Sequence, residues 1–229
     1  MATTLGYHEI VVKSTAYANF AVASERNISV VIPEGLVDGI IVVAIACRGA
    51  NPVTIVRDGQ TFYNERRGTE YDGCDTHIFY LRNPNVGTAN VVVTMSASDW
   101  SVVGVVVAEH VEGRSKFNPV LTYATSGRNA SYCNNVLINP LAGALAVDVQ
   151  SNTGTAAGNP STGQTKIVGS ADNDAGGISY EVGIPLGSQN VGWSGFQTSD
   201  TASSSLVVAF APARKRSNMA LAGFLGLLK

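Results

Sequence analysis

The sequence predicts an all-β protein: an antiparallel two-sheet β-sandwich, jelly-roll-like, built from two similar halves and followed by a short C-terminal helix or arm. Two observations carry this prediction. The apolar runs are short, rich in Val and Ile, and separated by Gly, Pro, Asn and Asp, as in proteins made of many strands and turns. In addition, one strand–turn–strand cassette occurs twice, about 100 residues apart.

The two cassettes are Ile78–Val93 and Ile178–Trp193. Ile, Tyr, Gly, Asn and Val recur at matching positions, and a Pro stands shortly before the matched glycines, Gly87 and Gly187. Pro and Gly in this order favour a turn between two extended segments. Each cassette is therefore predicted to be a strand, a turn and a second strand, and the repeat indicates a duplicated architecture.

The remaining elements follow from the same apolar runs, each bounded by turn residues. Asp58-Gly59 predicts a type I′ hairpin, because both turn residues of that type need a positive φ. Continuous apolar runs, such as Gly39–Ala46 and Leu206–Phe210, predict strands that are covered on both faces. The expected strands are, in order, Glu9–Ser14, Ala18–Val22, Ile28–Ile32, Gly39–Cys47, Val53–Arg57, Gln60–Tyr63, Thr76–Leu81, Ala89–Met95, Val102–His110, Leu121–Thr125, Asn134–Asn139, Ala144–Val149, Thr165–Val168, Ile178–Ile184, Asn190–Phe196 and Ser204–Ala211.

The repeat divides the chain into halves at about residues 28–112 and 120–213. Each half has an opening strand, a variable loop region, the cassette and a closing strand. Two such halves can interleave into one sandwich or form two small domains. Because no Pro-, Ser- or Gly-rich linker separates them, we expect a single domain over residues 1–213.

Residues 214–229 form a tail that is first basic and then apolar, in which Asn218 can cap a helix of about three turns. Its apolar part is too short to cross a bilayer, which needs about 20 residues, so we expect no transmembrane span. Such a tail suits a membrane surface, docks on its own sandwich or on a neighbouring subunit, or is a disordered end. We favour docking, with Phe224 and Leu225 as candidate contact residues.

Charged residues make up 14% of the chain, well below the quarter usual in soluble proteins. Weakly charged surfaces rich in Ser, Thr, Asn and Gly are common where β domains pack side by side. They also occur in carbohydrate-binding modules. The net charge of −2 gives no reason to expect nucleic acid as a partner. The N-terminus lacks the pattern of a secretory signal, and the three widely spaced cysteines, Cys47, Cys74 and Cys133, predict reduced thiols.

No segment carries a catalytic signature, so we expect no catalytic, cofactor-binding or metal-binding residue and no cofactor. The histidines lie in or beside predicted strands, without a nucleophile at a recognisable turn: His8, His77 and His110. The segment Gly192–Gly195 falls one residue short of a G-x-S-x-G elbow. Asp172–Gly177 resembles the start of a calcium loop but lacks the distal Glu, and is expected to be a solvated hairpin loop.

The loop at Asn64–Gly73 is the best candidate for a surface contact. It combines both charge signs with flanking aromatic residues between two predicted strands. Loops of this kind often carry binding residues. Arg66, Arg67 and Tyr71 are therefore candidates for contact with a subunit or a ligand.

The second part of the first cassette, Asn83-Pro84 followed by Gly87–Thr94, resembles a β-sandwich domain of phage structural and bacterial surface proteins, a largely uncharacterised family. The flanking strands Gly39–Ala46, Val102–His110 and Ser205–Pro212 extend the resemblance over roughly residues 28–213. The resemblance implies a virion or surface building block. We therefore expect a non-enzymatic virion structural protein of the capsid-associated kind (decoration or minor capsid), located in the virion after assembly in the host cytoplasm. It would oligomerise and anchor through a terminal arm, with other virion proteins and copies of itself as partners.

An alternative function is a receptor- or carbohydrate-binding module of a phage tail or of a bacterial surface adhesin, with a glycan or a host receptor as partner. Exposed Trp100 or Trp193 beside a polar cleft would favour it, whereas burial of both would favour the structural role. A hydrolase would need a carboxylate pair or a His–Ser pair in one pocket, and the sequence shows none.

Overall fold

The computed structural model describes residues 6–68, 70, 73–112, 119–129, 132–139, 141–153, 158–169, 176–194 and 202–215. The regular elements of these residues are strands, and their pairings are antiparallel, so the all-β prediction is confirmed. None of these residues forms a helix long and apolar enough to cross a membrane. The strands are β1 Val11–Ile32, β2 Ile40–Arg48, β3 Pro52–Arg57, β4 Gln60–Thr61, β5 Tyr63–Arg67, β6 Cys74–Arg82, β7 Gly87–Glu109, β8 Val120–Asn129, β9 Tyr132–Asn139, β10 Ala144–Asn152, β11 Asn159–Pro160, β12 Thr165–Gly169, β13 Gly176–Ile184, β14 Gly187–Ser194 and β15 Ala202–Phe210.

Strands β1–β7 and β8–β15 form two halves with the same strand order, called half one and half two below. The large sheet of half one has the order β5-β6-β2-β7-β1, and that of half two has the order β12-β13-β10-β15-β8. Each half also has an outer layer. In half one this layer is formed by the second part of β1, the first part of β7, and β3; in half two it is formed by β9, β14 and β11. Each half is therefore a small sandwich of its own.

The repeated cassette is confirmed as strand, turn, strand in both halves. It comprises β6 and the start of β7 in half one, and β13 and β14 in half two. The two turns have a positive φ at the same two places: 49° at Asn83 and 111° at Gly87, against 74° at Gly183 and 109° at Gly187. This backbone conformation suits Gly and Asn and strains most other residues. The matching residues therefore mark matching turns.

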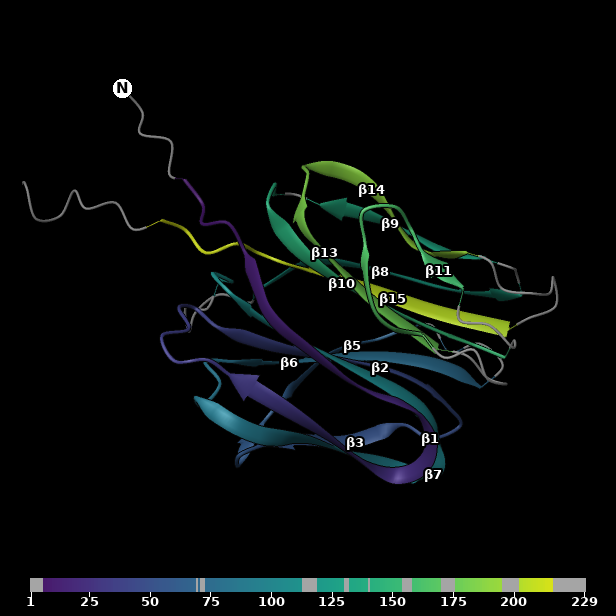
Figure 1. Ribbon diagram of the computed structural model, residues 1–229. Coiled ribbons are helices and arrows are strands. Elements are labelled where there is room, and N and C mark those ends of the chain that lie inside the picture. The colour runs from purple at the N-terminus through teal and green to yellow at the C-terminus, as the bar shows by residue number, and fades with distance from the viewer. Residues whose placement is uncertain are drawn as a thin grey trace, which may run out of the picture.

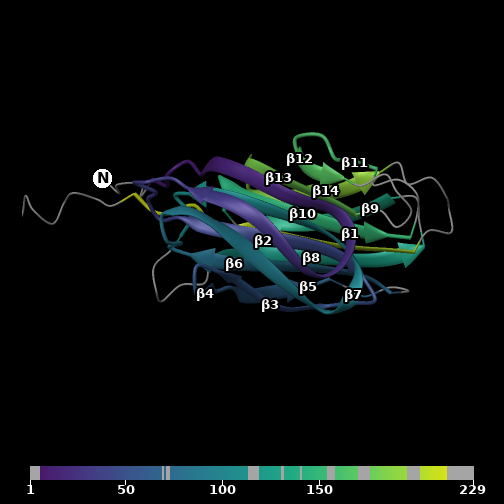
Figure 2. The same ribbon diagram turned by 60° about the horizontal axis from the view of Figure 1, so that its bottom comes forward.

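The two large sheets face each other, so the molecule has four layers (Figure 1). Figure 2 shows the strands of both halves running along the same long direction. Between the large sheets lies a central core to which both halves contribute, whereas a separate apolar cluster fills each half. The strands β2 and β15 are buried on both faces for this reason, as their continuous apolar runs predict, and β10 is buried on both faces as well. The central core includes Ile40, Val42, Ala44, Ile78 and Val106 of half one, and Leu145, Val147, Ile178, Leu206 and Phe210 of half two.

Two glycines let the halves approach closely. A Cβ atom on Gly104 of β7 would lie 2.9 Å from Cγ2 of Ile178, and one on Gly176 of β13 would lie 2.8 Å from Cβ of Ala46. Both contacts cross from one half to the other. Any larger residue at either position would push the two large sheets apart, because real Cβ atoms do not approach so closely.

The way in which the halves combine differs from the prediction. Each large sheet takes its strands from one half alone, so the halves do not interleave and the jelly-roll arrangement is not confirmed. Half one also begins before residue 28, because β1 starts at Val11 and pairs along β7 in one run with three register shifts. Such bulges bend a strand without ending it. They let β1 pass from the large sheet to the outer layer, where the sequence predicts three separate strands.

Other strand boundaries also differ from the prediction. The predicted strands Ala89–Met95 and Val102–His110 are both parts of β7, and Gln60–Tyr63 is divided between β4 and β5. The Asp58-Gly59 hairpin is confirmed, with φ values of 48° and 73°. The expected C-terminal helix lies at residues 216–229, which are outside the described residues.

The two ends of the described chain meet at one end of the molecule (Figure 1). The backbone N–H of His8 donates to the carbonyl oxygen of Ala213 at 2.8 Å, and that of Lys215 donates to Gly6 at 2.8 Å. On its other side, Ala213 donates to the carbonyl oxygen of His110 at 2.7 Å. We call residues 6–8, 110–112 and 211–215 the terminal clasp.

We expect the two halves to unfold together, because the central core belongs to both. On this prediction residues 1–213 form one domain. Phe210→Ala removes a fully buried side chain of the central core. It should lower the free energy of unfolding by about 3–5 kcal/mol. The measurement is denaturation by guanidinium chloride, followed by circular dichroism and by tryptophan fluorescence.

A single transition that shifts equally for both probes is the expected result, with Val43→Ala in the separate core of half one as the comparison. Two transitions, only one of which Phe210→Ala moves, would show that the halves are independent domains.

Candidate functional site

The predicted contact loop at residues 64–73 is only partly a loop. Its first residues belong to β5, which pairs with β6 at the edge of the large sheet of half one. Arg66 and Arg67 both lie on β5, but only the side chain of Arg67 is described. The other candidate contact residues, Tyr71, Phe224 and Leu225, lie outside the described residues.

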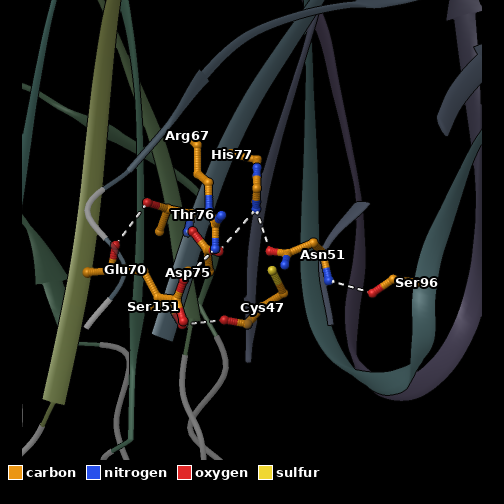
Figure 3. Close-up of polar contacts among 10 residues, drawn as sticks. Cys47, Asn51, Arg67, Glu70, Asp75, Thr76, His77, Ser96 and Ser151 are labelled. Carbon is orange, nitrogen blue, oxygen red and sulfur yellow. Dashed lines mark hydrogen bonds and ion pairs between the residues drawn. The ribbon is translucent and has the colours of Figure 1, made fainter. Parts of the chain in front are cut away.

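Arg67, Asp75 and His77 form a polar cluster at the end of half one (Figure 3). The Nε atom of Arg67 donates to Oδ2 of Asp75 at 2.7 Å, and its terminal nitrogen contacts the same oxygen at 2.5 Å. That terminal nitrogen also contacts Glu70 Oε2 at 2.6 Å. The Nε2 atom of His77 lies 3.5 Å from Asp75 Oδ2. The arginine therefore joins β5 and the residue Glu70 to a buried carboxylate on β6.

The alternation of a β-strand explains how these groups meet. Asp75 and His77 are two residues apart on β6, so their side chains share the face that carries Phe79 into the core of half one. On the neighbouring strand Arg67 is the register partner of His77. The side chains of Asp75 and His77 are 4% and 5% exposed, whereas that of Arg67 is 45% exposed. The cluster thus runs from a buried acid to a half-exposed base.

The electrostatics of the cluster favour the ionised form of Asp75. Burial alone would raise the pKa of this carboxyl, but hydrogen bonds from His77 and Arg67, together with their charges, outweigh burial and lower the pKa. The same pairing raises the pKa of Arg67, chiefly through its hydrogen bond to Asp75. Asp75 is therefore a charged residue that depends on its partners.

The geometry does not assemble a nucleophile with a general base. His77 Nε2 lies 3.2 Å from the amide oxygen Oδ1 of Asn51, which can only accept, so this nitrogen carries the hydrogen. The other ring nitrogen, Nδ1, is buried and has no hydrogen-bond partner. Burial, followed by the charge of Asp75, raises the pKa of the Cys47 thiol well above its ordinary value, which keeps it protonated and unreactive. In the part of the chain that the structure describes, the cluster acts as a fixed ion pair that fastens an edge strand.

The aromatic residues considered as a sugar platform lie in different environments. Trp193 is fully buried inside half two, so it is not part of a surface platform. Trp100 is half-buried, and the guanidinium carbon of Arg48 lies 5.6 Å from the centre of its ring. His8 and His110 lie in the terminal clasp with their ring centres 4.9 Å apart.

The remaining sequence-based candidates are only partly described. Residues 172–175 of the calcium-like segment Asp172–Gly177 lie outside the described residues. Among the residues that are described, no group of three His, Cys, Asp or Glu side chains could hold a metal ion. Cys47 and Cys74 are buried free thiols, and the side chain of Cys133 is not described.

The sequence predicts a structural role for His77. It does not show that Asp75 is the carboxylate that binds Arg67. It also gives no role to Asp148, a fully buried carboxyl of half two. One signal was present for Asp148, since an acidic residue stands in the middle of the otherwise apolar run Ala144–Val149. Acidic residues are rarely buried without a partner.

Comparison of the chain with protein-family models, with curated proteins and with solved structures finds no match. The fold and the polar cluster therefore rest on the sequence and the structure alone. The resemblance to phage structural and bacterial surface proteins stays a prediction.

Arg67→Ala should lower the free energy of unfolding at pH 7 by about 1–2 kcal/mol, because it takes a partner from buried Asp75. This value is below that of a fully buried pair, since Arg67 is 45% exposed and water screens the interaction. The pKa of Asp75 is lowered from 3.8 in the folded state, so this stabilisation is present above pH 3.8 and is lost as the pH falls below it. The measurement is chemical denaturation of both proteins between pH 3 and pH 8.

Glu70→Gln is the matched control, because Glu70 is 58% exposed and contacts the same guanidinium from the solvent side. It should change stability by less than about 0.5 kcal/mol. Equal effects of the two substitutions would contradict the assignment of Asp75 as the anchor.

Proposed function

We propose that this chain is a non-enzymatic structural subunit of a virion, of the capsid-associated kind (decoration or minor capsid), that oligomerises and attaches through its C-terminal arm. Its partners are copies of itself and other virion proteins, and its location is the virion. The observation that carries the proposal is the terminal clasp. It fixes residues 211–215 between two other segments, so the arm that follows leaves from an anchored strand.

The backbone bonds of the clasp suit an anchoring arm. The C-terminal segment is bonded to residues 6–8 on one side and to residues 110–112 on the other. Ala211 also donates to the carbonyl oxygen of Pro119 at 2.7 Å. Because these bonds run to three separate parts of the chain, the base of the arm is held firmly. The arm is rich in apolar residues, and the proposal assigns two of them, Phe224 and Leu225, to contact with a neighbouring subunit.

The surface of half two offers a place for such a contact. Val136 and Ile138 of β9 and Leu186 of the β13–β14 turn are 56%, 68% and 65% exposed. Val136 and Ile138 are two residues apart on β9, so their side chains share the outer face of this layer, and Leu186 lies in the turn that leads into the neighbouring strand β14. Exposed apolar side chains that lie together favour contact between proteins over contact with water. A second copy of the chain is the partner that this proposal needs.

The alternative, a receptor- or carbohydrate-binding module of a phage tail or a bacterial adhesin, has one observation in its favour. Tyr63 on the edge strand β5 is 59% exposed, and its ring centre lies 5.7 Å from that of Tyr80. Against it, Trp193 is buried and Trp100 is half-buried beside Arg48. The structural role therefore has the better support.

Removal of Asn218–Lys229 should leave the sandwich folded and weaken assembly, because the strands, the clasp and the core residues that the structure describes all precede residue 216. The measurements are thermal unfolding by circular dichroism and the molar mass of the full and shortened chains by light scattering over a range of concentrations. We expect an unchanged unfolding temperature and a lower molar mass for the shortened chain.

Two full-length variants serve as controls for chain length. The double variant Phe224→Ser, Leu225→Ser should weaken assembly as the deletion does, whereas Ser217→Ala should have no effect. If the shortened chain assembles like the full one, the C-terminal arm has no anchoring role and that part of the proposal is wrong.

A further inference from the structure

The interior of half two contains an unusual set of polar side chains. They lie between the large sheet and the outer layer, at the end where β10 and β14 finish and β15 begins. Each is 2% exposed or less. The apolar cluster of half two fills only the other end of the same space. The polar set consists of Asn135, Asp148, Gln150, Asn152, Ser179 and Ser205.

Half one shows that the same scaffold packs without polar residues at these positions. The strand registers define the equivalent residues: Asp148 pairs with Ser179 as Val43 pairs with Phe79, and Gln150 pairs with Ser205 as Ile45 pairs with Val103. Likewise Asn135 pairs with Val191 as Ile28 pairs with Val91. The equivalents in half one are Ile28, Val43, Ile45, Cys47, Phe79 and Val103, all of them in its apolar cluster.

Asp148 is the member of the set that can carry a charge. It is 0% exposed, and burial raises its pKa to about 7, although the hydrogen bond from Gln164 and the nearby N–H groups of Trp193 and Val149 favour the charged form. The Nε2 atom of Gln164 donates to Asp148 Oδ2 at 3.3 Å and to Ser179 Oγ at 2.8 Å. The second carboxyl oxygen, Oδ1, has no hydrogen-bond partner with good geometry. A charge on Asp148 is therefore only partly compensated.

The groups packed against Asp148 bring no positive charge within hydrogen-bond distance. They are Ser179 of β13, Val207 of β15, Trp193 of β14 and Gln164 of the turn before β12. The described cation that faces this region, Lys166 of β12, lies 5.8 Å from the centre of the Trp193 ring. The other carboxyl of β13 that faces the turn is Glu181, whose oxygen would lie 3.0 Å from a Cβ atom on Gly163. Burial raises the pKa of Glu181 as well.

Gln164 couples the state of Asp148 to the outer layer. Its amide nitrogen holds Asp148 and Ser179 of the large sheet. Its amide oxygen accepts from the backbone N–H of Gly192 at 3.3 Å and from that of Ser161 at 3.0 Å. One side chain thus bridges β10, β13 and β14. Water that enters to solvate a charged Asp148 must compete with these bonds.

We propose that half two is a proton-controlled part of the molecule: its outer layer packs firmly on the large sheet while Asp148 is protonated, and loosens when Asp148 loses its proton. The neutral carboxyl is tolerated in this interior, but its anion is not, because no positively charged side chain among the described residues is bonded to it. Half one lacks the device, since Val43 stands at the equivalent position. This inference is independent of the virion assignment.

The folded and unfolded pKa values of Asp148 determine whether stability rises or falls with pH. A carboxyl with a pKa of about 7 in the folded state and 3.8 in the unfolded state loses stabilisation as the pH rises from about 4 through about 7. Between pH 6 and pH 8 the ratio of folded to open forms of half two should fall by about tenfold, because each pH unit between the open-state and the folded-state pKa is worth up to a factor of ten and the ratio levels off above the folded-state pKa of about 7. Half one should not follow this change.

Amide hydrogen exchange of the full chain at pH 6 and pH 8, expressed as protection factors, tests the proposal. The protection factors of β9 and β14 should be about tenfold lower at pH 8. The equivalent segments of half one, Glu25–Ile32 and Gly87–Thr94, should be unchanged. Asp148→Asn should abolish the dependence in half two. Glu181→Gln, which removes the other carboxyl with a raised pKa, should retain it.

If Asp148→Asn fails to fold, a second measurement on the unmodified chain still tests the proposal. The carboxyl carbon of Asp148 in the unmodified chain, followed by nuclear magnetic resonance, should titrate in the same pH range as the change in exchange. Equal protection of half two at pH 6 and pH 8, or a change shared equally by both halves, would overturn the proposal. So would a titration of Asp148 below pH 5, or pH dependence that persists in Asp148→Asn.

Discussion

Every other part of the structure depends on the close contact between the two large sheets. This contact buries one face of β2, β6 and β7 against β10, β13 and β15, and the central core between them is a cluster of apolar side chains. Gly104 and Gly176 permit it, since a side chain at either place would collide with the opposite half. Both outer layers are built on these sheets, and the terminal clasp closes their shared end. Burial of apolar surface here supplies the main stabilising term for the whole molecule.

Much of the fold is visible in the sequence where local chemistry decides it. The turns at Asn83 and Gly183 combine a required backbone conformation with flanking β-branched runs, so the cassette can be recognised without a structure. The pairing of the halves cannot be recognised in this way, because interleaved and separate sheets bury the same apolar runs. The length of β1 is also hidden, since its three bulges place polar residues where a turn would place them.

The candidate site shows the same division. Charges around Arg67 mark a contact region in the sequence, but the buried acid that holds this arginine comes from β6 and becomes apparent only through strand register. Asp148 was hidden for a different reason. The alternation of Val147, Asp148, Val149 and Gln150 is typical of a strand with one face in water. In the structure both faces are covered, and the polar face lies inside half two. Alternation of polar and apolar residues therefore indicates that the two faces of a strand differ, but it does not indicate which face contacts solvent.

The terminal clasp determines how a mechanical load would travel through the molecule. The C-terminal segment 211–215 lies in the middle there, bonded to residues 6–8 on one side and to residues 110–112 on the other. A pull on the chain beyond Lys215, directed along this segment, would strain its backbone bonds in shear, all at once. Bonds loaded in this way share the force, whereas bonds at an edge strand would open one after another. The segment that follows β15 is thus suited to act as a tether, and the force would pass through His110 to β7 and reach the central core.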